Sequence, residues 1–293
     1  MRVLVTGAGG QLGSEVVAEL RRRDSERLRG RPIEVIAADH ARLDVADRDA
    51  VLGTVLGCEP HVVIHTAAWT AVDACESDPE RAFSVNALGT RHVAEAVRRV
   101  GAHLCCVSTD YVFDGRSERP YTEWDDPAPM SVYGRSKLGG EREAGGSATI
   151  VRTSWVCGRN GANIVKTVLR MLPGGGVLSF VDDQRGSPTV ARDLARSVVD
   201  LALSRRPGIF HVTNQGSTSW YGLARAVVGF AGGDPGRVRP ITTAELDPPR
   251  AAPRPANSVL DNAALRSSGL PLLPHWKDSI RGLVEELLAD GSR

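Results

Sequence analysis

Thr6-Gly-Ala-Gly-Gly-Gln-Leu-Gly13 follows the apolar run Arg2-Val-Leu-Val5 at the start of the chain. A short apolar run that ends in a glycine cluster indicates a buried strand feeding a tight turn. Residues 11–23 then repeat apolar side chains at helical spacing. Three glycines of the stretch form the spacing G-x-x-G-x-x-G: Gly7, Gly10 and Gly13. Glycines let backbone amides approach a pyrophosphate at a helix N-terminus, so this context predicts a dinucleotide-binding site. The alternative is a loop that merely turns the chain.

Further apolar runs alternate with helical stretches through the first half of the chain. The predicted strands cover residues 33–38, 62–66, 104–108 and 149–154, and the predicted helices lie near 47–57 and 79–100. Strands that alternate with helices indicate a parallel sheet with helices on both faces. We therefore expect an α/β protein built on a Rossmann-type, doubly wound parallel sheet.

The second half of the chain is less regular, because glycine- and proline-rich loops separate shorter elements there. We expect residues 1–150 to form the dinucleotide-binding domain. Residues 151–293 are expected to supply the remaining strands of the sheet and a smaller C-terminal substrate-binding lobe. We expect this lobe to be discontinuous in sequence.

The composition of the chain excludes several classes of function. Lys and Arg number 36 and Asp and Glu 35, a net charge of +1, which argues against a nucleic-acid partner held by bulk electrostatics. No apolar run approaches the roughly 20 residues of a membrane span. The start of the chain lacks a signal-peptide pattern, and its five cysteines contain no C-x-x-C pair. We expect a cytoplasmic protein that binds neither nucleic acid nor membrane.

The segment Ser131-Val-Tyr-Gly-Arg-Ser-Lys137 sets a tyrosine and a lysine four residues apart, on one face of a helix. An ammonium beside a phenol favours the phenolate, so we expect Lys137 to lower the pKa of Tyr133. Such a tyrosine can exchange a proton with a carbonyl oxygen near neutral pH. Tyr-x-x-x-Lys alone also occurs on solvated helix surfaces. Combined with the glycine-rich loop and with Thr109 at a strand end, it indicates a nicotinamide-dependent reductase.

Two carboxylates after the second predicted strand are candidates to bind the cofactor. Asp39 can accept hydrogen bonds from an adenosine ribose, which favours NADH, whereas the nearby His40 and Arg42 leave NADPH open. The alternative is that Asp39 and Asp44 simply cap turns. Ala67-Ala-Trp-Thr70 ends the third predicted strand, where small residues let a cofactor lie across the sheet edge.

Eight stretches carry a resemblance to one family. They are Thr6–Gly13, Ala67–Asp73, Val107–Gly115, Tyr133–Glu141, Arg152–Val156, Val181–Thr189, Ser219–Tyr221 and Arg254–Asp261. On these stretches the chain resembles the dTDP-4-dehydrorhamnose reductases, which are extended short-chain dehydrogenases, over nearly its whole length. The later stretches separate it from generic nucleotide-sugar epimerases.

The resemblance implies reduction of the C4 ketone of dTDP-4-dehydro-L-rhamnose to dTDP-L-rhamnose, with NADPH or NADH as cofactor. It implies a catalytic trio of Thr109, Tyr133 and Lys137. The residues implied to hold the cofactor are Gly7, Gly10, Gln11, Leu12, Gly13, Asp39, Asp44, Val45, Ala67, Ala68, Trp69, Thr70, Tyr133 and Lys137. Those implied to bind a dTDP-linked 4-keto-6-deoxyhexose are Thr109, Asp110, Tyr111, Trp155, Asn163, Gln184, Arg185 and Arg254.

Alternatives stay open at several of these positions. Asp110 can cap a turn and Tyr111 can simply pack, while Trp155 can be a core aromatic rather than a sugar-stacking one. Arg185 and Arg254 suit phosphate oxygens but can equally form structural ion pairs. Two further positions, Trp69 and Cys157, differ from the residues common in the family and are expected to reshape the substrate pocket.

The oligomeric state and the precise activity have alternatives too. Some family members dimerise through magnesium held by acidic side chains, but Ala191-Arg-Asp193 leaves one acid there, with Glu15 as the other candidate. We therefore predict no metal site and a monomer or weak homodimer. The competing functions are a reductase of another dTDP-4-keto-deoxysugar, a non-catalytic homologue of the methionine adenosyltransferase regulatory subunit, and an epimerase. The intact trio argues against the regulatory function.

Overall fold

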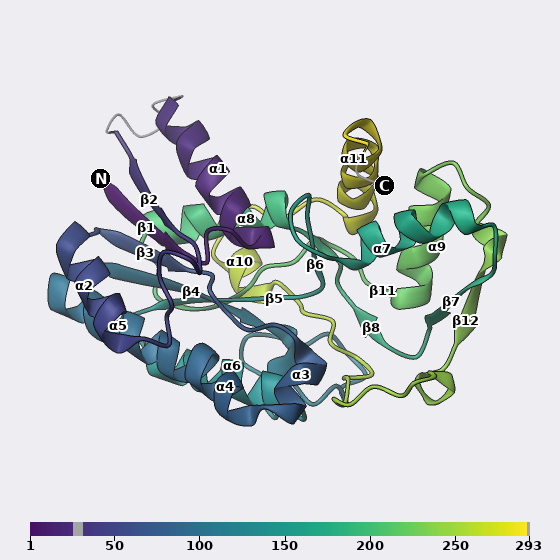
Figure 1. Ribbon diagram of the computed structural model, residues 1–293, viewed down its shortest axis with the longest axis horizontal. Helices are drawn as coiled ribbons and strands as arrows, with labels where there is room; N and C mark the ends of the chain where they lie inside the picture. The colour runs from purple at the N-terminus through teal and green to yellow at the C-terminus, as the bar shows by residue number, and fades with distance from the viewer. Residues whose placement is uncertain (26–31, 292–293) are drawn as a thin grey trace.

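The computed structural model describes residues 1–25 and 32–291. Its centre is a six-stranded sheet in the order β10-β5-β4-β3-β1-β2, with every neighbouring pair parallel (Figure 1). The strands are β1 (Arg2–Thr6), β2 (Glu34–Ala38), β3 (Val62–His65), β4 (His103–Thr109), β5 (Thr149–Thr153) and β10 (Gly208–His211). The expected parallel sheet is confirmed. The strand order reverses between β1 and β3, which in open α/β sheets opens a crevice at the carboxyl ends of the strands.

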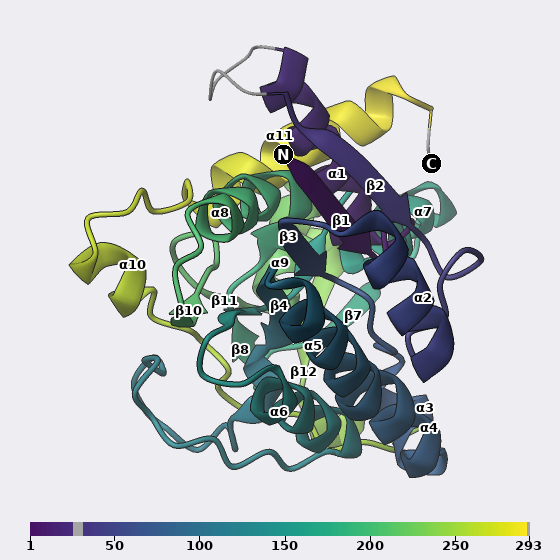
Figure 2. The same cartoon turned by 90° about the vertical axis from the view of Figure 1, so that its left-hand side faces the viewer.

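Helices cover both faces of the sheet (Figure 2). They are α1 (Gln11–Ser25) and α8 (Ala191–Leu203) on one face, and α2 (Arg48–Cys58), α5 (Gly89–Val100) and α6 (Val132–Ala144) on the other. Successive side chains of a strand point to opposite faces. Val3 and Val5 accordingly pack into the core beneath α1 and α8, while Leu4 packs beneath α2 and α5. Two buried cores thus hold the sheet between its helical layers.

The predicted helix near residues 79–100 is divided into three parts in the structure. After α3 (Val72–Ser77), the chain forms α4 (Pro79–Phe83), a π-helical turn (Ser84–Leu88) and then α5. Asp78 begins α4 by accepting a hydrogen bond from the backbone amide of Arg81 at 3.0 Å. Single π-turns inside helices are frequent at functional sites. This one carries Asn86, whose contacts are described below.

The remaining elements form a second lobe beside the carboxyl edge of the sheet (Figure 1). Its helices are α7 (Ile164–Met171), α9 (Trp220–Phe230) and α11 (Trp276–Ala289), and α10 (Ala263–Ser267) lies near β10. Its short strands are β6 (Val156–Cys157), β7 (Leu178–Val181), β8 (Arg185–Gly186), β9 (Thr189–Val190), β11 (Thr218–Ser219) and β12 (Val238–Ile241). Since α8 and β10 return to the sheet, the lobe alternates with it along the chain. The division at residue 150 stays a prediction.

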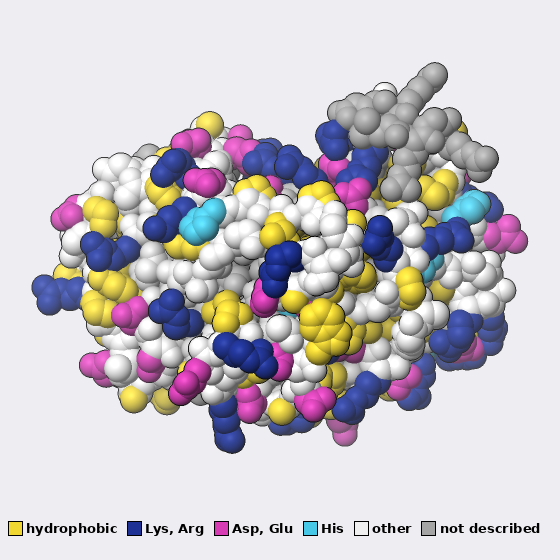
Figure 3. All heavy atoms as spheres, turned by 180° about the vertical axis from the view of Figure 1, so that it is seen from behind, with side chains coloured by type: hydrophobic (Ala, Val, Ile, Leu, Met, Phe, Trp, Pro, Cys, Tyr) yellow, Lys and Arg dark blue, Asp and Glu magenta, His cyan; other side chains and the backbone are white. Residues whose placement is uncertain are grey.

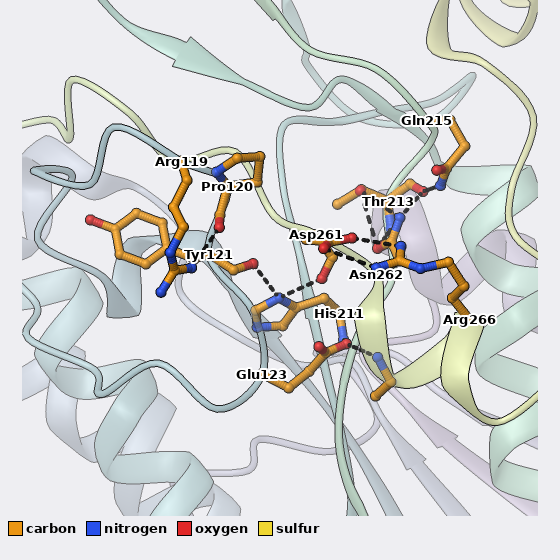
Figure 4. A network of polar contacts seen from close by, with 11 residues as sticks. Arg119, Pro120, Tyr121, Glu123, His211, Thr213, Gln215, Asp261, Asn262 and Arg266 are labelled. Atoms are coloured by element: carbon orange, nitrogen blue, oxygen red, sulfur yellow. Dashed lines mark hydrogen bonds and ion pairs between the residues drawn. The ribbon is translucent and has the colours of Figure 1, made fainter.

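A polar network fastens two irregular segments to the edge strand β10 (Figure 4). The backbone amide of His211 donates to Glu123 at 2.8 Å, and its Nδ1 lies 3.1 Å from the carbonyl oxygen of Tyr121 and 3.2 Å from that of Asp261. Burial lowers the pKa of His211 to about 3, so the ring is neutral and Nδ1 carries its proton. The network holds the segment around Tyr121 beside residues 257–262, which lead to the site.

Charged side chains of both signs are interspersed over the face shown in Figure 3. Within the described part of the chain, no helix is long and apolar enough to cross a membrane.

Candidate functional site

The glycine-rich turn joins β1 to α1 at the reversal point of the sheet. Gly7 has a φ of 68°, and a Cβ there would lie 2.6 Å from the backbone nitrogen of Ala67. A Cβ at Gly13 would lie 2.2 Å from the carbonyl oxygen of Gly7. Both positions therefore require glycine, because any larger residue would collide with backbone. The turn brings the N-terminus of α1, with its unpaired amides, to the carboxyl edge of the sheet.

The two aspartates after β2 both cap turns. Asp39 accepts a hydrogen bond from the amide of Arg42 at 3.0 Å, and Asp44 accepts one from the amide of Ala46 at 3.0 Å. Asp39 also borders the glycine-rich turn, since a Cβ at Gly9 would lie 3.4 Å from the Cβ of Asp39. The turn-capping alternative therefore describes their contacts within the protein. Their role toward a ribose or adenine stays a prediction.

The segment after β3 is fixed by a residue that sequence reasoning missed. The side chain of Asn86 accepts from the amide of Trp69 at 2.8 Å and donates to its carbonyl at 3.1 Å. It also donates to Ser136 of α6 at 2.9 Å. The guanidinium of Arg81 lies over the Trp69 ring, 4.6 Å from the ring centroid. Asn86 thus ties Ala67, Ala68, Trp69 and Thr70 to the helix of the predicted trio.

The structure brings Thr109, Tyr133 and Lys137 together beneath the carboxyl edge of the sheet. Ser131 caps α6 by accepting a hydrogen bond from the amide of Gly134 at 3.0 Å, which places Tyr133 in the first helical turn. The hydroxyl of Thr109 lies near that of Tyr133 and acts to lower the pKa of the phenol, against the larger effect of burial. All three side chains are buried, with 7%, 8% and 5% of Thr109, Tyr133 and Lys137 exposed. Their catalytic roles stay predictions.

The expectation that Lys137 lowers the pKa of Tyr133 is wrong for this structure. Burial raises the pKa of Tyr133 well above its ordinary value, and the nearby hydroxyl of Thr109 offsets only part of that rise. The ammonium of Lys137 donates instead to the carbonyl of Val107 at 2.7 Å, and burial lowers its own pKa. An i, i+4 spacing places two residues on one face, but the nearest acceptor decides where a long side chain points.

Asp110 is a buried carboxyl group surrounded by hydroxyls. It is 2% exposed, and it accepts hydrogen bonds from Thr109 at 3.0 Å and from Ser154 at 2.9 Å. Ser258, from the segment that the His211 network holds in place, also lies near this carboxyl group and acts to lower its pKa. Burial raises the pKa of Asp110 to about 6, although these hydroxyl contacts oppose the rise. Sequence reasoning missed Ser154 and Ser258, although both lie in stretches that carry the family resemblance.

Arg254 forms a structural ion pair, which is one of the two alternatives that the sequence left open for it. Its guanidinium binds both carboxylate oxygens of Asp73, at 2.5 and 2.6 Å. This pairing lowers the pKa of Asp73 to about 2. Arg254 also lies next to Tyr111, whose ring meets Tyr133 edge-on at 5.6 Å between centroids. Arg254 therefore lies beside the trio, with its charge already engaged by Asp73.

Trp155 and Gln184 meet in the second lobe through Trp220. The rings of Trp155 and Trp220 stack 3.5 Å apart with an interplanar angle of 7°. Trp155 has a φ of 46°, and a Cβ at Gly186 would lie 2.4 Å from its ring. The indole nitrogen of Trp220 donates to Gln184 at 3.2 Å. Protein thus covers one face of the Trp155 ring, as expected for the alternative in which Trp155 is a core aromatic. Its contact with a sugar stays a prediction.

The last two residues predicted to bind the substrate, Arg185 and Asn163, contact different parts of the protein. Arg185 on β8 has an exposed side chain, and its backbone amide donates to the carbonyl of Ala256 at 2.8 Å. Asn163 caps α7 and donates to the side chain of Gln11 at 3.0 Å. The structure therefore places Asn163 against the glycine-rich loop, where it links the lobe to the predicted cofactor site.

The acids considered for a metal bridge have other partners. Asp193 accepts hydrogen bonds from Ser279 at 2.6 Å and from Asn214 at 3.2 Å. The pKa of Glu15 is raised by burial, against the opposing charge of Arg192. Across residues 1–25 and 32–291, no three His, Cys, Asp or Glu side chains gather as metal ligands.

The parallel sheet, the glycine-rich turn and the buried Thr-Tyr-Lys trio together define a protein of the short-chain dehydrogenase/reductase class. The chain belongs to the family of the RmlD substrate binding domain, whose pattern it matches over residues 1–289. The family resemblance drawn from the eight stretches is thereby confirmed.

Named relatives extend over nearly the whole chain. A dTDP-4-dehydrorhamnose reductase of Streptomyces griseus is 42% identical over 288 residues, covering 95% of this chain and 91% of the relative. A probable dTDP-4,6-dihydroxy-2-methyloxan-3-one 4-ketoreductase of Streptomyces antibioticus is 41% identical over 296 residues, covering 99% and 96%. The crystal structure of the dTDP-4-dehydrorhamnose reductase of Bacillus anthracis in complex with NADP superposes with a TM-score of 0.89 at 36% identity, covering 97% of this chain and 99% of that one.

Proposed function

We propose that this protein is an NAD(P)H-dependent reductase of the C4 ketone of dTDP-4-dehydro-L-rhamnose, with dTDP-L-rhamnose as product. The observation that carries the proposal is the buried contact between Thr109 and Tyr133 at the carboxyl edge of the sheet, beside Lys137 and close to the glycine-rich turn. Relatives that share about two residues in five along the whole chain are reductases of this substrate class.

The residues present fit a nicotinamide dinucleotide. At Gly7 and Gly13, neighbouring backbone atoms occupy the space that a Cβ would need, so the chain can make this tight turn only with glycine. The amides at the start of α1 face the same edge of the sheet. Asp39 borders that turn and offers its carboxylate to a ribose. We assign the turn, Gln11, the two aspartates after β2 and residues 67–70 to this cofactor. When bound, the nicotinamide supplies the hydride for the ketone carbon.

The chain's own residues supply the proton and the orientation. We assign Tyr133 as the group that gives a proton to the ketone oxygen, because its hydroxyl lies at the strand ends and its high pKa keeps it protonated. Thr109 places its own hydroxyl near that of Tyr133, and Lys137 fixes the helix face against β4 through the carbonyl of Val107. Arg254 and Tyr111 form the wall beside Tyr133 and are assigned to the substrate.

The proposal includes a cytoplasmic location and a monomeric or weakly dimeric state. All five cysteines are free thiols, which suits a reducing compartment. Cell fractionation and sedimentation with and without a chelator test these two statements.

The test of the function is turnover on the named substrate. dTDP-4-dehydro-L-rhamnose, generated in situ by an epimerase, is added with NADPH or NADH, and cofactor absorbance is followed. Fast oxidation with dTDP-L-rhamnose as the identified product is the expected result. The same assay with other dTDP-4-keto-6-deoxyhexoses decides the sugar specificity. Tight cofactor binding without oxidation in any of these reactions would contradict the proposal and favour a non-catalytic role.

A further inference from the structure

The first turn of α1 faces two parts of the molecule at once. Gln11 begins the helix directly after the glycine-rich turn, and the backbone amides of a first helical turn have no partner inside the helix. These amides face the carboxyl edge of the sheet, to which the cofactor is assigned. The side chain of Gln11 extends instead to the second lobe, where Nε2 donates to the carbonyl of Ala162 at 3.2 Å. Gln11 thus borders the cofactor site with its backbone and binds the lobe with its side chain.

The partner of Gln11 in the lobe is the segment of residues 158–163, between β6 and α7 (Figure 1). Asn163 donates from its side-chain amide to Oε1 of Gln11 at 3.0 Å and to the carbonyl of Gly158 at 2.8 Å. Both polar atoms of the Gln11 side chain are therefore paired with this segment. The approach is close, since a Cβ at Gly161 would lie 2.7 Å from Cγ of Gln11.

Asn163 also fixes where α7 begins. Its side-chain oxygen accepts from the backbone amide of Lys166 at 3.2 Å, so it is the N-cap of that helix. α7 packs against α9, whose first residue is Trp220. Trp220 stacks on Trp155, which is predicted to contact the sugar. A short series of contacts therefore leads from Gln11 to the predicted sugar pocket.

We propose that Gln11 and Asn163 are positioning residues that couple the two ligands, so that cofactor bound at the glycine-rich turn raises the affinity of the lobe for the nucleotide sugar. This inference rests on the proposed function. A pyrophosphate bound to the first-turn amides fixes the backbone of Gln11, so less conformational freedom remains to be lost when its side chain binds the lobe. Because coupling between binding sites is reciprocal, the nucleotide sugar raises the affinity for the cofactor by the same factor.

A purely structural role of the same contacts leads to a different expectation. If they only hold the lobe in place, their removal changes stability and both affinities, but each ligand binds equally well with and without the other. The ratio of the dissociation constants of one ligand, measured without and with the other, therefore isolates the coupling. A direct contact between Asn163 and the nucleotide sugar would change both constants by one factor and leave their ratio unchanged.

The first test measures binding rather than turnover. Isothermal titration calorimetry of dTDP without and with saturating NADP⁺ gives this ratio, and we expect it to be at least about fivefold in the wild type. Gln11→Met keeps the backbone amides and the length of the side chain, whereas Asn163→Ser keeps a cap for α7 but does not reach Gln11. Each variant should lower the ratio to about 1, the value for uncoupled sites. A wild-type ratio of about 1, or a wild-type ratio that survives in both variants, would overturn the proposal.

The matched control is Asn160→Ala. Asn160 lies in the same lobe segment and donates to the hydroxyl of Ser14, three residues beyond Gln11, at 2.8 Å. Removing this hydrogen bond weakens the same junction between the lobe and α1 but leaves the Gln11 side chain paired. The ratio should therefore stay at its wild-type value. A loss of coupling as complete as in Asn163→Ser would show that general docking of the lobe causes it, and the assignment to Gln11 would fall.

Hydrogen–deuterium exchange gives a second measurement that does not need the nucleotide sugar. NADP⁺ should slow the exchange of amides in residues 158–171, the lobe segment and α7, and should no longer do so in Gln11→Met at saturating cofactor. If this protection is as expected while dTDP does not bind and the keto-sugar is not reduced, the proposed function fails and the link from Gln11 to the lobe stands. Normal reduction of the keto-sugar without any protection by NADP⁺ would refute the coupling and leave the proposed function intact.

Discussion

Replacing Glu141 by glutamine should destabilise the fold far more than the same change two residues away at Glu143. Glu141 on α6 binds Arg152 on β5 through two hydrogen bonds of 2.9 and 2.7 Å. The side chain of Arg152 is 2% exposed and that of Glu141 is 5% exposed. Glutamine keeps the shape of the side chain but removes its charge, so the guanidinium of Arg152 stays buried after losing its carboxylate.

The magnitude follows from that burial. Removing one partner of a buried ion pair costs about 3–5 kcal/mol, because the other charge is left in a medium that solvates it poorly. Among the described residues, Nη1 of Arg152 has no hydrogen-bond partner that could compensate. Glu143 pairs with Arg91, whose side chain is 54% exposed, and exposed pairs contribute little to stability. Since whole domains are stable by about 5–15 kcal/mol, the first loss is a large share of the total.

Urea unfolding at pH 7, followed by circular dichroism and by fluorescence, measures the two effects. Coincident transitions from the two probes justify a two-state analysis, and equal slopes show that the surface exposed on unfolding is unchanged. The double change Glu141→Gln with Arg152→Met should recover much of the lost stability, since it removes the unpaired charge. Equal urea midpoints for Glu141→Gln and Glu143→Gln would refute the reasoning.

Three further predictions concern the site. Tyr133→Phe removes the proton donor and should lower kcat by about 10²–10⁴-fold, while fluorescence titration shows NADPH still bound; unchanged turnover would remove Tyr133 from the mechanism. Asp39→Ala should shift the ratio of the NADH and NADPH specificity constants toward NADPH, and a constant ratio would mean that Asp39 does not read the ribose. Gly7→Ala should weaken cofactor binding and lower the melting temperature, because its Cβ would lie 2.6 Å from the nitrogen of Ala67. Gly53→Ala, where a Cβ meets nothing within 4 Å, is the control and should melt no lower than the wild type.

The architecture of the first half was predictable because its signals are local. Strand, turn and helix each leave a short repeating pattern, and the glycines at Gly7 and Gly13 mark positions where backbone passes too close for a side chain. The irregular half was less predictable. The helix expected near residues 79–100 contains a π-turn, and neither its position nor the role of Asn86 shows in the apolar spacing.

The candidate site was likewise predictable only in part. The sequence by itself determined which residues meet at the strand ends: Thr109 closes β4, and the capped start of α6 presents Tyr133 and Lys137 on one face. Their chemistry depended on distant partners. Arg254 is paired with Asp73, 181 positions away, and Asn163 contacts Gln11, 152 positions away.

The pKa of Tyr133 shows most clearly what only the tertiary structure decided. The spacing to Lys137 correctly placed both residues on one helical turn, yet it predicted a lowered pKa where burial produces a raised one. The pKa of a buried group depends on how completely the fold removes water and on which polar atoms remain within reach. Both quantities depend on residues outside the helix that carries Tyr133, here Thr109 at the end of β4 and Asp110 directly after it. A local pattern therefore determines where such a side chain lies, and the packed structure determines its charge.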